Sequence, residues 1–242
     1  MITTILFDLG GTLWDDFPSV RASWEDIREE LRALGIKLTD TSFNNLVDDG
    51  IAAYAPSLTR TIIWRAVRGD YSKYRRVVRV VIERLKERME RDFFRYNRLY
   101  AGVRDVLDEL KGKYLLGVAS NNISEARGWL AKFELTDYFS TVGISEELWL
   151  FKPDTRFYER ILHEMGAPAE ETMMVGDRLD NDIFPCNRLR MTTVRVLSEP
   201  YRRQEPRYHT DQPDFTIKNV SMLPSVLKLL NAGLAAKARP AP

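Results

Sequence analysis

Cysteine and histidine are scarce in this chain of 242 residues, which contains one cysteine and two histidines. The lone Cys186 excludes an intramolecular disulfide and a cysteine-rich metal site. A single cysteine is compatible with a reducing compartment, and we expect a cytoplasmic protein.

Net charge is also nearly absent, because 36 Lys and Arg residues are balanced by 35 Asp and Glu residues. This balance argues against a protein dedicated to nucleic acid or to a membrane surface. No run approaches the roughly 18 to 20 apolar residues that a membrane span needs. The start, MITTILFD, reaches an acidic residue too early for a signal peptide. We therefore expect no nucleic-acid partner and no membrane, whereas the sequence says nothing about the oligomeric state.

The sequence does contain short apolar runs, each followed by polar or glycine-containing residues. They are Ile2–Phe7, Tyr114–Ala119, Thr172–Val175 and Thr192–Val196. Because the runs are short and do not alternate, they are typical of strands buried on both faces. The later segment PDFTIKN is compatible with one more strand.

Helical patterns lie between these runs or follow them: Val103–Lys111, Ile123–Phe133, Arg156–Met165 and Val220–Leu230. Strands that alternate with helices predict an α/β fold with a doubly wound parallel sheet.

The stretch 15–98 breaks this rhythm, because it holds no convincing strand and at least three helical patterns. Two of them are Ser23–Leu34 and Lys73–Tyr96, each with apolar residues at helical spacing. We interpret 15–98 as a helical subdomain inserted into an α/β core made of 1–14 and 99–242. The ending 235–242, AAKARPAP, is small and proline-rich, and we expect it to fray.

Positive charge is concentrated in the insert, where residues 60–98 hold 13 Lys and Arg against 5 Asp and Glu. Two interpretations stay open. The run either draws in an anionic substrate or is an ordinary solvated helix face.

Polar residues follow the predicted strands. Asp8 closes the first strand, Ser120 and Asn121 end the second, and the third runs into the acidic segment 176–182. Lys152 precedes the next helix. Because ligands bind beyond the carboxyl ends of parallel strands, we expect these side chains to converge on one edge of the sheet.

Such a constellation is suited to phosphate chemistry. A carboxylate is ionised at neutral pH, so Asp8 is able to attack without a general base and form a covalent intermediate. Mg²⁺ held by Asp8 and Asp177 would remove most of the repulsion between two anions. Lys152 would neutralise phosphoryl oxygens, while Ser120 and the Asn121 backbone N–H would hydrogen-bond them.

Four segments in this order, FDLGGTL, ASNN, FKPD and VGDRLDND, resemble the four motifs of the haloacid dehalogenase superfamily of hydrolases, most of which are phosphatases. The resemblance covers roughly residues 1–14 and 99–230. The helical insert is similar to that superfamily's cap, which closes over the substrate. The resemblance implies a Rossmann-like core and hydrolysis of a small phosphorylated molecule through an aspartyl-phosphate.

The resemblance also assigns roles. Asp8 and Lys152 are the catalytic residues, with Asp8 the nucleophile. Thr12, Ser120, Asn121 and Lys152 form the phosphate site, and Thr12 also supports the loop. The metal ligands for Mg²⁺ are Asp8, Asp177, the carbonyl of Gly10 and, in the outer shell, Asp182.

One position departs from the pattern. Phosphatases of this superfamily carry a second aspartate two residues after the nucleophile as general acid and base, and this chain has Gly10 there. General acid–base help is typically worth about 10²- to 10⁴-fold.

Four interpretations follow from Gly10. The substrate has a leaving group that needs little protonation, or another group, with Asp15, Asp16 or a cap residue as candidates, replaces the acid. Alternatively, the chemistry is that of the dehalogenase or phosphonatase branches, or the protein is a catalytically impaired binding protein. The retained Asp177 and Asp182 favour a metal-dependent phosphatase over a dehalogenase, and no cap lysine lies in a recognisable phosphonatase motif.

Overall fold

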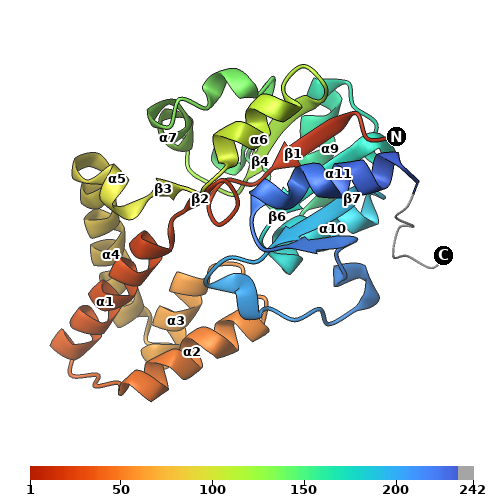
Figure 1. Cartoon of the computed structure of the whole chain (residues 1–242). Coiled ribbons are helices and arrows are strands. Elements are labelled where there is room, and N and C mark those ends of the chain that lie inside the picture. The colour runs from red at the N-terminus through yellow and green to blue at the C-terminus, as the bar shows by residue number, and fades with distance from the viewer. Residues whose placement is uncertain (234–242) are drawn as a thin grey trace. The chain divides into compact units, whose positions relative to one another are not determined.

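The computed structural model describes residues 1–233, so the tail 235–242 lies outside the described residues. The chain divides into two compact units: Met1–Trp14 together with the chain from Leu99 onward, and Asp15–Arg98 (Figure 1). We call the first unit the core and the second the helical unit. None of the helices in residues 1–233 is long and apolar enough to cross a membrane.

The core is built on one six-stranded sheet in the order β5-β4-β1-β6-β7-β8, and every pair in it is parallel. The strands are β1 (Thr4–Phe7), β4 (Leu115–Ser120), β5 (Thr141–Ile144), β6 (Thr172–Gly176), β7 (Thr192–Val196) and β8 (Phe215–Ile217). The predicted doubly wound α/β fold is confirmed. The sequence patterns missed β5, because four residues that include Gly143 give too weak a strand signal.

Within residues 1–233, six α-helices connect or flank these strands: α6 (Val103–Leu110), α7 (Ala126–Lys132), α8 (Ser145–Leu148), α9 (Thr155–Met165), α10 (Phe184–Arg188) and α11 (Leu223–Asn231). Short 3₁₀ turns lie at Thr136–Tyr138, Ala169–Glu171, Tyr201–Arg203, His209–Asp211 and Val220–Met222.

Successive side chains along each strand point to opposite faces of the sheet, and apolar side chains are buried on both faces. Leu6, Ala119 and Met174 point to the face on which Phe157 of α9 and Cys186 of α10 are buried. The helices α6 and α11 lie on the opposite side of the sheet (Figure 1). Helices on both faces leave the carboxyl ends of the central strands as the edge where polar side chains gather.

The helical unit contains α1 (Phe17–Ala33), α2 (Asp40–Ala52), α3 (Leu58–Ala66), α4 (Tyr71–Arg91) and α5 (Phe93–Tyr96). Two short strands, β2 (Trp14–Asp15) and β3 (Arg98–Leu99), pair with each other where the chain leaves the core and returns to it. The predicted helix 73–96 is in fact two helices, because Asp92, at φ −131°, leaves the helical conformation between them.

An ion cluster joins α1 to α4 within the helical unit. Asp26 of α1 accepts from Arg84 at 3.2 Å and pairs with Arg88 at 2.6 Å. The side chains of Asp26 and Arg88 are each only 12% exposed. A largely buried arginine that loses its carboxylate is left with an uncompensated charge, which is more destabilising than losing an exposed pair.

We therefore expect Asp26→Asn to lower the free energy of unfolding by about 2 kcal/mol, measured by urea denaturation. The matched control is Asp40→Asn, because Asp40 also pairs with an arginine, Arg28, but its side chain is 88% exposed. That exposed pair is worth less than about 1 kcal/mol. Equal losses in the two variants would contradict the argument.

Candidate active site

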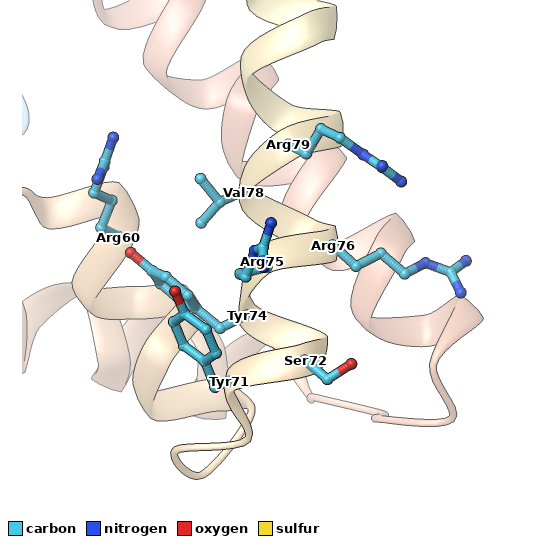
Figure 2. A pocket seen from close by; sticks show the side chains of 8 residues that line it. All are labelled: Arg60, Tyr71, Ser72, Tyr74, Arg75, Arg76, Val78 and Arg79. Atoms are coloured by element: carbon cyan, nitrogen blue, oxygen red, sulfur yellow. The ribbon is translucent and has the colours of Figure 1, made fainter.

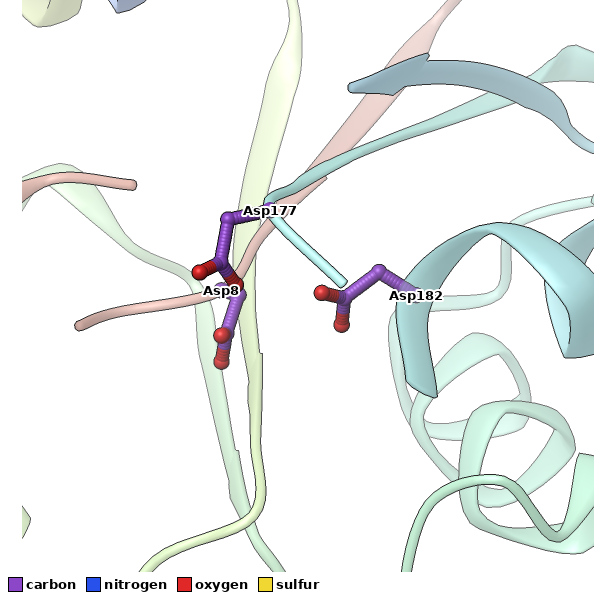
Figure 3. Close-up of side chains that lie close together, drawn as sticks. All are labelled: Asp8, Asp177 and Asp182. Carbon is purple, nitrogen blue, oxygen red and sulfur yellow. The ribbon is translucent and has the colours of Figure 1, made fainter. Parts of the chain in front are cut away.

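Three aspartates gather at the carboxyl edge of the sheet. Asp8 follows β1, Asp177 follows the neighbouring β6, and Asp182 lies five residues further on. One carboxylate oxygen from each lies within 4.8 Å of the other two, and Figure 3 shows the three side chains together. Asp177 and Asp182 are buried, whereas Asp8 is partly open to solvent.

Lys152 joins two of these carboxylates. Its Nζ donates to Asp182 Oδ1 at 2.6 Å and lies 3.1 Å from Asp8 Oδ1, and its side chain is 1% exposed. The backbone of Lys152 is fixed in turn by the Asn121 side-chain amide. Lys152 N donates to Asn121 Oδ1 at 2.8 Å, and Asn121 Nδ2 donates to Lys152 O at 3.0 Å.

Burial and charge act in opposite directions on this lysine. Burial alone would lower the pKa of Lys152, but the carboxylates of Asp182 and Asp8 outweigh it and raise that pKa. Burial raises the pKa of Asp182 to about 6; Lys152 opposes this rise and the like charge of Asp8 adds to it. The ammonium group therefore stays charged in a site from which water is largely excluded.

Asp182 is held by an unusual turn. The segment Leu179–Ile183 forms one π turn, in which Arg178 O accepts from Asp182 N at 2.9 Å and from Ile183 N at 3.3 Å. Arg178 N donates to Asp182 Oδ2 at 3.0 Å. A Cβ on Gly176 would lie 2.4 Å from Asp182 Cγ, so only glycine fits beneath this carboxylate.

Asp177 is held from two sides. Ser198 Oγ donates to Asp177 Oδ2 at 3.0 Å. Gly11 passes so closely that its Cβ would lie 2.5 Å from the same oxygen, and its φ of +69° also favours glycine. The backbone of the turn after β1 therefore packs directly against the Asp177 carboxylate.

A second polar network secures the π turn from the segment after β7. Arg178 donates to both carboxylate oxygens of Asp180, and its guanidinium carbon lies 4.4 Å from the centroid of the Tyr201 ring. Gln204 accepts from Leu179 N at 2.7 Å and donates to Asp180 Oδ1 at 2.9 Å.

Sequence patterns could not identify Ser198, Tyr201 or Gln204, because these residues follow the last clear strand and lie outside any motif. Tyr158 was also missed. Its hydroxyl donates to Asn181 O at 2.6 Å, and its ring centroid lies 6.0 Å from Lys152 Nζ. These four residues support the site rather than line its acidic edge.

The remaining candidates lie at the same edge. Ser120 ends β4, which pairs with β1 so that Val118 lies opposite Phe7; Ser120 is buried. Thr12 is fully buried, and its Oγ1 has no hydrogen-bond partner among residues 1–233. The structure therefore brings the ends of β1, β4 and β6 and the segment carrying Lys152 to one place.

The charges of Lys152 and the three aspartates indicate which kind of ligand the site would bind. Three ionised carboxylates and one ammonium leave a net charge of about −2 in a poorly solvated site. Hard carboxylate oxygens at such spacing are the ligands that Mg²⁺ prefers. The donor set fits a divalent cation.

We expect Gly176→Ala to destabilise the protein by about 1 to 3 kcal/mol in urea denaturation, because the new methyl group overpacks Asp182. Gly128→Ala in α7 is the matched control, since a Cβ there meets nothing within 4 Å. A comparable loss in the control would show that the effect does not arise from Asp182.

Comparisons with known proteins identify the family of this chain. A family model described as haloacid dehalogenase-like hydrolase matches residues 2–187. The chain is 30% identical over 241 residues to a glyceraldehyde 3-phosphate phosphatase from Methanopyrus kandleri, covering 95% of this chain and 99% of that protein.

Solved structures share the fold. A haloacid dehalogenase phosphatase from Thermococcus onnurineus has a TM-score of 0.65 at 21% identity and covers 93% of this chain and 98% of its own. The hydrolase YfnB from Bacillus subtilis, solved with bound magnesium, has a TM-score of 0.63 at 19% identity, with the same coverage of each chain. With its family match, its fold and its convergent aspartates, this enzyme belongs to the haloacid dehalogenase-like hydrolases.

Proposed function

We propose that this hydrolase is a phosphatase that cleaves a small phosphate ester through a covalent intermediate on Asp8. The observation that carries the proposal is the position of Lys152, whose Nζ lies 3.1 Å from Asp8 and 2.6 Å from Asp182. A buried cation beside an ionised, partly exposed carboxylate is the arrangement that attack on an anionic phosphoryl group requires.

The reaction has two steps. An Asp8 carboxylate oxygen attacks phosphorus, the bond from phosphorus to the ester oxygen breaks, and that oxygen leaves with the electron pair and takes up a proton from solvent. Water then attacks the phosphorus of the aspartyl-phosphate and gives up a proton to solvent. The bond from phosphorus to the Asp8 oxygen breaks, inorganic phosphate leaves, and the Asp8 carboxylate is regenerated.

The residues around Asp8 have separate tasks in these steps. Lys152 balances charge on the phosphoryl oxygens, and the side chain of Asn121 keeps its backbone in place. Ser120 and the Asn121 backbone N–H hydrogen-bond the phosphoryl group. Thr12, whose Oγ1 has no hydrogen-bond partner in the described part of the chain, supplies a further polar atom in the turn that follows Asp8.

The same site would hold Mg²⁺ through Asp8, Asp177 and the Gly10 carbonyl, with Asp182 in the outer shell. When bound, the ion supplies charge that offsets repulsion between the nucleophile and the phosphoryl group. Ser198 and Gly11 keep the Asp177 carboxylate in position for this role.

Gly10 determines which substrates are cleaved well. It has no side chain with which to protonate the leaving oxygen, so an acidic leaving group suits the site better than an alkoxide. The name of the Methanopyrus kandleri relative makes glyceraldehyde 3-phosphate the first natural substrate to test. We further propose that the helical unit acts as a cap that excludes water during the first step.

p-Nitrophenyl phosphate tests the nucleophile and the metal together, because nitrophenolate leaves without needing a proton. We expect steady turnover with Mg²⁺ and none after chelation with EDTA. Asp8→Asn should lower kcat by about 10³-fold or more. Asp137→Asn, which changes an exposed aspartate elsewhere in the core, should leave turnover unchanged. Turnover that survives in Asp8→Asn would contradict the covalent mechanism, and a wild type inactive with every divalent cation would exclude the phosphatase.

Gly10→Asp tests the missing acid. We expect the wild type to favour p-nitrophenyl phosphate strongly over an alkyl ester such as glyceraldehyde 3-phosphate. The added carboxyl group should raise kcat/KM for the alkyl ester by about 10²-fold or more while changing that for p-nitrophenyl phosphate far less. Equal effects on both substrates would show that leaving-group protonation does not limit the wild type.

A further inference from the structure

A basic and aromatic hollow of about 670 Å³ lies on the helical unit, where the first half of α4 meets Arg60 of α3. Figure 2 shows its side chains, with the rings of Tyr71 and Tyr74 beside Arg60 and with Arg75 rising from α4 next to them. None of the residues assigned to phosphate hydrolysis lines this hollow.

The spacing on α4 places these residues on one face. Tyr71, Arg75 and Arg79 follow each other at four-residue intervals, with Tyr74 and Val78 between them. An amphipathic helix normally carries apolar residues at this spacing and buries them. The buried residues of α4 are instead Val77 and Val81, each about 200° around the helix from an arginine of this face.

Some basic residues of α4 form ion pairs and others do not. Lys73 pairs with Asp70, and Arg76, which also lines the hollow, lies 3.8 Å from Glu30. Further along the helix, Arg84 pairs with Asp26, Glu29 and Glu30, and Arg88 pairs with Asp26. In contrast, Arg60, Arg75 and Arg79 of the hollow form no ion pair with any acidic side chain among residues 1–233. Like charges four residues apart destabilise a helix, so Arg75 and Arg79 are arranged in a way that a bound anion would stabilise.

The aromatic residues add a flat surface beside these charges. Tyr71 is 63% exposed. Its ring lies 21° from the plane of Tyr74 with centroids 6.3 Å apart, and Trp64 supports Tyr74 edge-on at 5.5 Å. The Arg75 guanidinium carbon lies 5.9 Å from the Tyr71 centroid. An exposed, supported aromatic face is a platform on which a planar ring stacks.

We propose that this hollow binds a nucleoside polyphosphate. The guanidinium groups of Arg60, Arg75 and Arg79 take the phosphates through paired N–H donors, and the base stacks on Tyr71. The phosphates account for the arginines that form no ion pair within residues 1–233, and the base accounts for the exposed ring of Tyr71. The inference does not depend on the proposed phosphatase activity, because no residue of the acidic site takes part in it.

Isothermal titration of the full-length protein with ATP, in EDTA so that the acidic site receives no metal, tests the proposal. We expect saturable binding that weakens as salt is added. The double variant Arg75→Ala with Arg79→Ala should raise Kd by at least about tenfold. The matched control is Lys86→Ala with Arg91→Ala, which removes two charges from exposed positions at the other end of the same helix and should leave Kd unchanged.

Further titrations distinguish the contribution of the base from that of the phosphates. Tyr71→Ala should weaken ATP but not inorganic triphosphate, and adenosine alone should bind more weakly than ATP. Absence of ATP binding, an equal effect of the control pair, or triphosphate binding as tightly as ATP with no effect of Tyr71→Ala would overturn the proposal. Loss of binding in Lys152→Ala, with Arg75→Ala and Arg79→Ala ineffective, would assign ATP to the acidic site instead. Hydrolysis of p-nitrophenyl phosphate by the Arg75 and Arg79 double variant should be unchanged. The nucleotide site and the phosphatase activity are therefore tested independently of each other.

Discussion

The ammonium group of Lys152, buried between the carboxylates of Asp8 and Asp182, is the interaction on which the acidic edge of the sheet depends. Asp8 and Asp182 carry like charges, and in a poorly solvated place their repulsion would drive one of them to take up a proton. A single lysine that contacts both keeps them together. Because the three side chains come from three separate segments, this one cation also joins the ends of β1, the π turn and the segment before α9.

Backbone packing, rather than further charge, makes this arrangement rigid. Asn121 fixes the Lys152 backbone through two hydrogen bonds, and Gly11 and Gly176 let main chain approach Asp177 and Asp182 at distances that a side chain would prevent. The segment after β7 adds Ser198 and Gln204 at the back of the same turn. In the mechanism proposed above, groups held in this way would need little reorganisation when charge moves at Asp8, which is the condition for electrostatic catalysis.

Much of this was predictable from the sequence, because strand ends and motif order carry the information. The apolar runs locate β1, β4, β6 and β7, and parallel pairing then brings Asp8, Ser120 and Asp177 to one edge. Residues whose role depends on tertiary contact were not predictable. Gln204, in the segment after β7, contacts Leu179, which lies 25 positions earlier in the chain. Asn121 acts through its side chain on Lys152, whereas the pattern assigned it only a backbone role. The hollow on α4 was not predictable for the same reason, since counting charges shows an excess of arginine but not which arginines form no ion pair within residues 1–233.

The pairing of β2 with β3 has a consequence for the evolution of this chain. Paired strands run about 4.8 Å apart, so the two points at which the helical unit joins the core are neighbours. Closing a loop between neighbouring points depends only weakly on its length. The 84 residues between Trp14 and Leu99 can therefore be shortened, extended or replaced without moving the strand ends that carry Asp8, Ser120 and Asp177. The helical unit is free to diverge in length and sequence while the acidic edge of the sheet stays as it is.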